Sequence, residues 1–150
     1  MTIIPFPYYP YIKKEDARDL VKSQRMMMPA VLCMGIIVIG IMQFFVTPKL
    51  LNLYKELNEQ VPLITQLSPY ILGLIVSVFT IISIYFLATP PNYERLEKVL
   101  SKYKDGEMIK RSEIVEVKYE ALVLILLGLM VAYLVISTIV PIYNLTAKLQ

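Results

Sequence analysis

The stretch MMMPAVLCMGIIVIGIMQFFVT, residues 26–47, contains no charged side chain. Two further stretches share this property, PYILGLIVSVFTIISIYFLAT at 69–89 and ALVLILLGLMVAYLVISTIV at 121–140. A helix of about 20 apolar residues is long enough to cross the roughly 30 Å hydrocarbon core of a bilayer. The sequence therefore predicts an all-α membrane protein with three transmembrane helices, short amphipathic helices beside them, and no sheet.

The segments between these stretches are short. The chain has 150 residues, 57% of them hydrophobic, and no connecting segment is long enough to form a soluble domain of its own. We therefore expect a single membrane domain with membrane lipids as its solvent. Its parts are an arm and short helix at 1–25, spans at 26–47, 69–89 and 121–140, loops at 48–68 and 90–120, and a tail at 141–150.

Basic residues are distributed unevenly over the connecting segments. Residues 1–25 carry five Lys or Arg and residues 90–120 carry seven, whereas residues 48–68 carry two and the tail carries one. The positive-inside rule then predicts a multi-pass protein of the cytoplasmic (inner) membrane, with the N-terminus and the 90–120 loop in the cytoplasm and the C-terminus outside. Because the chain's 12 acidic residues are interspersed among the basic ones, we expect no nucleic-acid partner.

The first twelve residues, MTIIPFPYYPYI, predict an extended arm, because three prolines in this segment exclude a helix. An arm so rich in apolar side chains is expected to lie on the membrane interface or to pack on a partner. Since proline lacks a backbone N–H, we predict that the arm becomes ordered only on such a surface. The candidate docking side chains are Phe6, Tyr8, Tyr9 and Tyr11.

The two loops contain helical patterns. Apolar residues recur near every 3.6 positions over residues 50–60, which predicts an amphipathic helix that either extends the first span or lies along the outer interface. In the 90–120 loop, Asn92 is placed to cap a helix, Gly106 to stop it, and a second helix is expected from Ser112 into the third span.

Small residues four positions apart occur inside two spans. Such pairs allow the backbones of neighbouring helices to approach closely, so we expect these positions to contact other helices, including those of other integral membrane subunits. The candidate packing residues are Gly73 with Ser77 and Gly128 with Ala132.

The chain has no histidine, no charged residue inside a predicted span and no glycine-rich phosphate loop. These are the parts that general bases, metal and haem ligands, ion pathways and nucleotide sites usually require. The sequence therefore predicts no catalytic, cofactor-binding or metal-binding residue, and a protein that is not an enzyme.

Three short segments carry a family resemblance: VTPK at 46–49, VPLIT at 61–65 and IVPIY at 139–143. In this order they resemble the F-domain family of type II secretion and type IV pilus systems, which are polytopic inner-membrane platform proteins. The positions that match the family pattern are Pro48, Tyr54, Pro62, Thr65 and Pro141.

The resemblance implies a reduced platform protein, because the chain has 25 and 31 residues where the family carries helical cytoplasmic domains. It also implies the same orientation as the charges, and a cytoplasmic assembly ATPase as a partner. The leading hypothesis is thus a non-enzymatic membrane scaffold subunit of a multi-protein complex. The alternative is an accessory subunit that braces a large respiratory, photosynthetic or other membrane enzyme.

Overall fold

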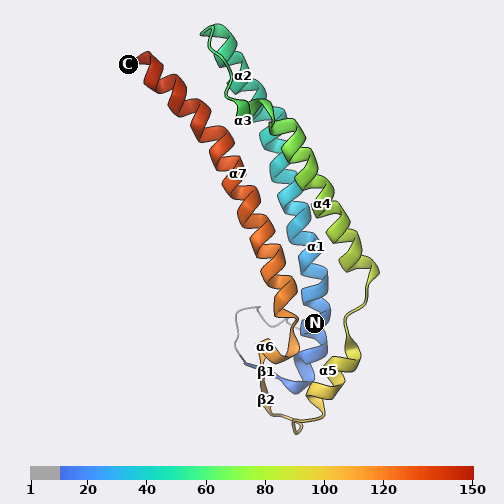
Figure 1. Cartoon of the computed structure of the whole chain (residues 1–150). Helices are drawn as coiled ribbons and strands as arrows, with labels where there is room; N and C mark the ends of the chain where they lie inside the picture. The colour runs from blue at the N-terminus through green and yellow to red at the C-terminus, as the bar shows by residue number, and fades with distance from the viewer. Residues whose placement is uncertain (1–10) are drawn as a thin grey trace. The chain divides into compact units, whose positions relative to one another are not determined.

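The structure is a computed structural model that describes residues 11–150. Three of its helices are long and apolar enough to cross a membrane: the run Lys14–Glu56, α4 (Ser68–Ala88) and α7 (Val117–Leu149). The prediction of an all-α membrane protein with three such helices is confirmed (Figure 1). The run Lys14–Glu56 consists of η1 (Lys14–Asp16), α1 (Ala17–Ile41), η2 (Met42–Val46) and α2 (Thr47–Glu56). The shorter elements outside it are β1 (Tyr11–Lys13), α3 (Leu63–Gln66), α5 (Tyr93–Leu100), β2 (Met108–Lys110) and α6 (Arg111–Ile114).

The chain folds as two compact units. Unit 1 comprises Met1–Val31 and Ile82–Val123, and unit 2 comprises Leu32–Ile81 and Leu124–Gln150. The helices α1, α4 and α7 contribute residues to both units.

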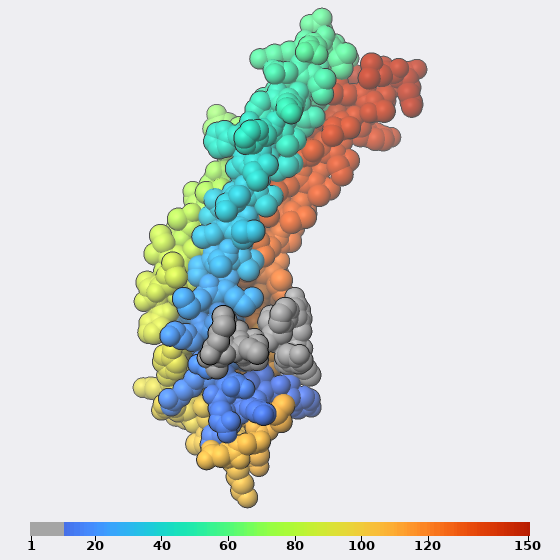
Figure 2. All heavy atoms as spheres, turned by 180° about the vertical axis from the view of Figure 1, so that it is seen from behind, coloured from blue at the N-terminus to red at the C-terminus, as the bar shows by residue number. Residues whose placement is uncertain are grey.

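Unit 1 contains a small antiparallel sheet, so the prediction of a protein without a sheet was wrong. Strand β1 pairs with β2, and Ile12 lies opposite Ile109 with both side chains buried. In Figure 2 the beginning of α1 and the β2 segment lie together on one face of this unit. The strand forms because Tyr11 follows the last proline of the arm, so the backbone N–H groups that a ladder needs are present from there on.

This sheet also changes the prediction for the arm. Tyr11, expected to become ordered only on a partner or bilayer, is paired within the chain, although half of its surface is exposed. The other three candidate docking residues, Phe6, Tyr8 and Tyr9, lie outside the described residues.

A hydrophobic core holds unit 1 together. Its nine buried residues come from β1, α1, α5, β2, α6 and the residue after α6: Ile12, Ala17, Leu20, Val21, Leu96, Leu100, Ile109, Ile114 and Val115. Asn92 caps α5 as predicted, since its Oδ1 accepts a hydrogen bond from the Arg95 N–H at 3.1 Å.

Two helix boundaries in unit 1 differ from the predictions. Helix α5 ends at Leu100, and Gly106, with φ of 85°, lies in the turn before β2 instead of stopping the helix. A continuous helix from Ser112 into the third span was also wrong, because Val115 is extended between α6 and α7. This break buries the adjacent Ile114 and Val115 in the core.

In unit 2 the first long helix continues through the π-helical turn η2 into α2. Of the two expectations for the amphipathic segment, the structure shows the extension of the first span. Pro48 lies in the first turn of α2 and has no N–H to donate, which accounts for the widened turn before it. Helix α2 ends at Glu56, before the predicted Gln60, and Asn58 adopts φ of 51° in the reversal that follows.

One close contact between the helices of unit 2 lies at a glycine that sequence reasoning missed. A Cβ atom at Gly35 of α1 would lie 3.0 Å from Phe79 Cε2 and 3.4 Å from Met130 Sδ, so any larger residue there would require these side chains to move. By contrast, a Cβ at Gly73 or Gly128 would meet no atom of the described residues within 4 Å.

Candidate functional site

Two residues that match the family pattern, Tyr54 and Thr65, contact α7 near Pro141, which is buried inside that helix. Because proline has no backbone N–H, the carbonyl of Ser137, four residues earlier, loses its helical donor. The Thr65 hydroxyl of α3 donates to this carbonyl oxygen at 3.3 Å. A side chain from α3 thus replaces the hydrogen bond that the proline removes from α7.

Tyr54 of α2 makes the second contact. Its hydroxyl donates to the carbonyl oxygen of Pro141 at 2.7 Å, and its side chain is only 2% exposed. One hydroxyl therefore bonds to the carbonyl one turn before the proline of α7, and the other bonds to the carbonyl of the proline itself. We call Tyr54, Thr65, Ser137 and Pro141 the Pro141 cluster.

Other polar side chains of unit 2 also connect its segments to one another. Tyr133 of α7 donates to the carbonyl of Ile64 at 3.0 Å, and the Ser68 hydroxyl lies 3.4 Å from Gln43 Oε1. Lys148 forms an ion pair with Glu59. Each contact joins segments that are far apart in the sequence.

Pro48 and Pro62 act at the beginnings of the two helices that reach the cluster. Pro48 lies in the first turn of α2, which carries Tyr54, and Pro62 is the N-cap residue of α3, which carries Thr65. Proline suits the N-cap position of α3, since its fixed φ is compatible with entry into a helix, whereas at Pro48 the widened turn η2 accommodates the missing N–H. The positions that match the family pattern are thus two prolines at the beginnings of α2 and α3, the two hydroxyl donors, and the proline of α7.

The small-residue pairs are placed differently. Gly73 and Ser77 of α4, and Gly128 and Ala132 of α7, are all exposed. The Ser77 hydroxyl donates to the Gly73 carbonyl of its own helix at 2.9 Å. No described residue of the chain packs closely on the two glycines, so both faces are open to lipid or to another protein.

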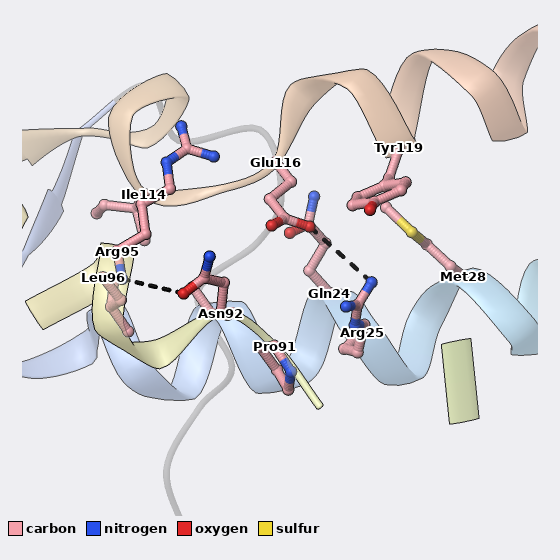
Figure 3. A pocket seen from close by; sticks show the side chains of 11 residues that line it. Gln24, Arg25, Met28, Pro91, Asn92, Arg95, Leu96, Ile114, Glu116 and Tyr119 are labelled. Carbon is pink, nitrogen blue, oxygen red and sulfur yellow. Dashed lines mark hydrogen bonds and ion pairs between the residues drawn. The ribbon is translucent and has the colours of Figure 1, made fainter. Parts of the chain in front are cut away.

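Unit 1 contains a polar cavity that sequence reasoning did not predict. Its volume is about 20 Å³, and Figure 3 shows the side chains around it. Arg25 is the central group. Its guanidinium lies 5.3 Å from the ring centres of both Phe86 and Tyr119, and its Nη2 donates to the Pro90 carbonyl at 3.3 Å. Glu116 Oε2 lies 3.9 Å from Arg25 Nη1.

The only feature of the sequence that relates to this cavity is the placement of two charged residues next to the apolar stretches. Arg25 is the last charged residue before the stretch at 26–47, and Glu116 lies in the segment before the third apolar stretch. Nothing in the sequence indicates that the two side chains meet, because 91 positions separate them.

Comparisons with known proteins return no match: no family model, curated protein or solved structure resembles the chain closely enough to be identified as a relative.

Proposed function

We propose that the chain is a non-enzymatic scaffold subunit of a multi-protein membrane complex, in the manner of a reduced secretion or pilus platform protein. The proposal includes the orientation that the charges favour, with the N-terminus and the 90–120 loop in the cytoplasm of a cell whose inner membrane holds the protein.

The observation that carries the proposal is the use of buried hydroxyl groups in unit 2. Tyr54 and Thr65 both donate to backbone carbonyls of α7, and Tyr133 of α7 donates to the backbone at Ile64. A hydroxyl committed to a backbone carbonyl fixes helix ends and helix contacts. Such a framework is what a subunit needs if its task is to hold partners in position.

The open faces of α4 and α7 supply places for those partners. Gly73 and Gly128 leave the helix backbone accessible, which favours close packing by another transmembrane helix. Unit 1 supplies a different surface, with exposed charges such as those of Arg18 and Glu97. In the proposed orientation this surface faces the cytoplasm, where an assembly ATPase would dock.

Site-specific photo-crosslinking in native membranes tests the proposal. A photoreactive side chain at Gly73 or at Gly128 is expected to form discrete crosslinks to integral membrane proteins. The matched controls are the exposed neighbours Leu74 and Leu129, which point to other sides of the same helices. Crosslinks to lipid alone at all four positions would contradict the scaffold proposal.

The identity of the crosslinked proteins decides between the two kinds of complex to which the chain could belong. An ATPase and pilin-like proteins in the same complex would support the platform assignment. Subunits that carry haem, pigment or metal would assign the chain to the alternative role, the bracing of a large membrane enzyme.

A further inference from the structure

We propose that the cavity of unit 1 binds one water molecule, which bridges the side chains of Gln24 and Arg25 to the carboxylate of Glu116. The inference is independent of the proposed function, because it rests on the geometry of unit 1 alone.

The size of the cavity suits this occupant. A water molecule needs at least about 10–15 Å³ of accessible space, and the cavity has about 20 Å³. A lipid phosphate group is much larger than this. The Glu116 carboxylate on the cavity wall would also repel a phosphate.

Two hydrogen-bond donors on the cavity wall lack an acceptor. The Gln24 Nε2 and Arg25 Nε atoms are both buried, and neither has a hydrogen-bond partner among the described residues. Leaving such buried donors unpaired is unfavourable, because each has lost its hydrogen bonds to water without a replacement. Both residues line the cavity, so both side chains lie beside the proposed water.

The separation between the side chains of Arg25 and Glu116 also fits a bridging water. Their nearest charged atoms lie 3.9 Å apart, which is too far for a direct hydrogen bond. Polar groups at such a separation are commonly joined through water. A water that accepts from Gln24 and Arg25 and donates to Glu116 makes three hydrogen bonds, the usual number for a buried water.

Solid-state NMR of the full chain in lipid bilayers, with ¹⁵N-labelled side chains, tests this inference. Magnetisation transferred from water is expected at Gln24 Nε2 and Arg25 Nε, and it should build up faster there than at the backbone amide of the buried Leu32. The variant Val21→Ile adds one methylene group to the cavity wall. We expect it to reduce the transfer to Arg25 Nε by more than half. The control Val117→Ile, at a half-exposed position, should leave the transfer unchanged.

Three results would overturn the inference. The first is the absence of water transfer to both side chains in the native protein. The second is undiminished transfer in Val21→Ile, because the water would then lie elsewhere. The third is a dipolar contact between Arg25 Nε and lipid ³¹P, which would identify a lipid headgroup as the occupant.

Discussion

The two units of this chain are stabilised by different interactions. Unit 1 is built as a domain in water would be, with nine hydrophobic residues from several short elements buried in one core. Unit 2 consists mainly of long apolar helices, and large hydrophobic side chains occur on their exposed faces as well as on the faces that pack together. Its specific contacts are a close approach at Gly35 and the hydroxyl–carbonyl bonds of the Pro141 cluster.

The difference follows from the solvent. Burying apolar surface is strongly favourable in water, so the core of unit 1 is stabilised by the hydrophobic effect. A bilayer supplies apolar surroundings already, so transmembrane helices associate through close packing and hydrogen bonds. Substitutions of apolar side chains should therefore have large effects in unit 1, and substitutions of small or polar ones should matter most in unit 2.

The largest expected effect is at Ile109, which is fully buried between β1 and the core of unit 1. We expect Ile109→Ala to destabilise unit 1 by about 2–5 kcal/mol, because it removes buried methylene groups and leaves a cavity. Limited proteolysis of the 90–120 loop in lipid nanodiscs measures this change. The control is Met108→Ala on the exposed side of the same strand, which is 52% exposed and should resemble the native protein. Equal protease sensitivity of the two variants would contradict a core centred on this strand.

The next effect is expected at Gly35 in unit 2. Leucine there would overlap Phe79, since a Cβ alone already lies 3.0 Å from that ring. We expect Gly35→Leu to cost about 1–3 kcal/mol in reversible unfolding from mixed micelles, the usual cost of overpacking. Gly40→Leu is the matched control, because a Cβ at Gly40 meets no described atom within 4 Å. A larger loss at Gly40 than at Gly35 would show that the helices of unit 2 pack differently.

A smaller and more specific effect is expected within the Pro141 cluster. Thr65→Val removes the donor to the Ser137 carbonyl and should cost about 0.5–1.5 kcal/mol. In a Pro141→Ala background the restored backbone N–H can bond to that carbonyl, so Thr65→Val should cost close to nothing there. A double-mutant cycle of unfolding free energies measures the difference.

Tyr54→Phe is the control for this cycle, because Tyr54 donates to the carbonyl of Pro141 itself. A backbone N–H at position 141 does not replace that bond. Tyr54→Phe should therefore cost the same in both backgrounds. The explanation of the cluster fails if Thr65→Val is equally costly with and without the proline.

The smallest expected effect is the pH dependence of unit 1. The Tyr103 hydroxyl donates to the Glu113 carboxylate, and this hydrogen bond raises the pKa of Tyr103 above its ordinary value of 10.0. Because the folded-state pKa is the raised one, the stabilisation is complete below the ordinary value and is lost as the pH rises through the raised pKa. Titration of ¹³C-labelled tyrosine by NMR measures it. In Glu113→Gln the pKa of Tyr103 should move back toward 10.0, and an unchanged pKa would exclude Glu113 as the cause.

The long helices could be predicted from the sequence because their signal is local. Charge-free stretches gave the positions of the three long helices, and Asn92 was identified as a cap from its place before an amphipathic pattern. The sheet could not be found in this way. Ile12 and Ile109 are 97 positions apart, and a three-residue strand has too few residues to show alternation.

The candidate sites were predictable to different degrees. The family pattern selected Tyr54, Thr65 and Pro141, but only the structure shows that the two hydroxyls bond to the α7 backbone around the proline. The sequence drew attention to Gly73 and Gly128, yet Gly35 makes the close approach within the chain. The spacing of small residues cannot show which side of a helix faces its own bundle. The contact of Arg25 with Glu116 brings a residue within α1 beside the residue that precedes α7, and the sequence shows no pattern for it.

The most direct test of the central claim is purification of the protein at its natural level from native membranes in mild detergent, with mass spectrometry of what accompanies it. We expect other integral membrane subunits in fixed proportion to the chain, and we expect them to be lost when Gly73 and Gly128 are both replaced by leucine. A chain that purifies alone and monomeric, with or without those substitutions, would contradict the proposed scaffold role.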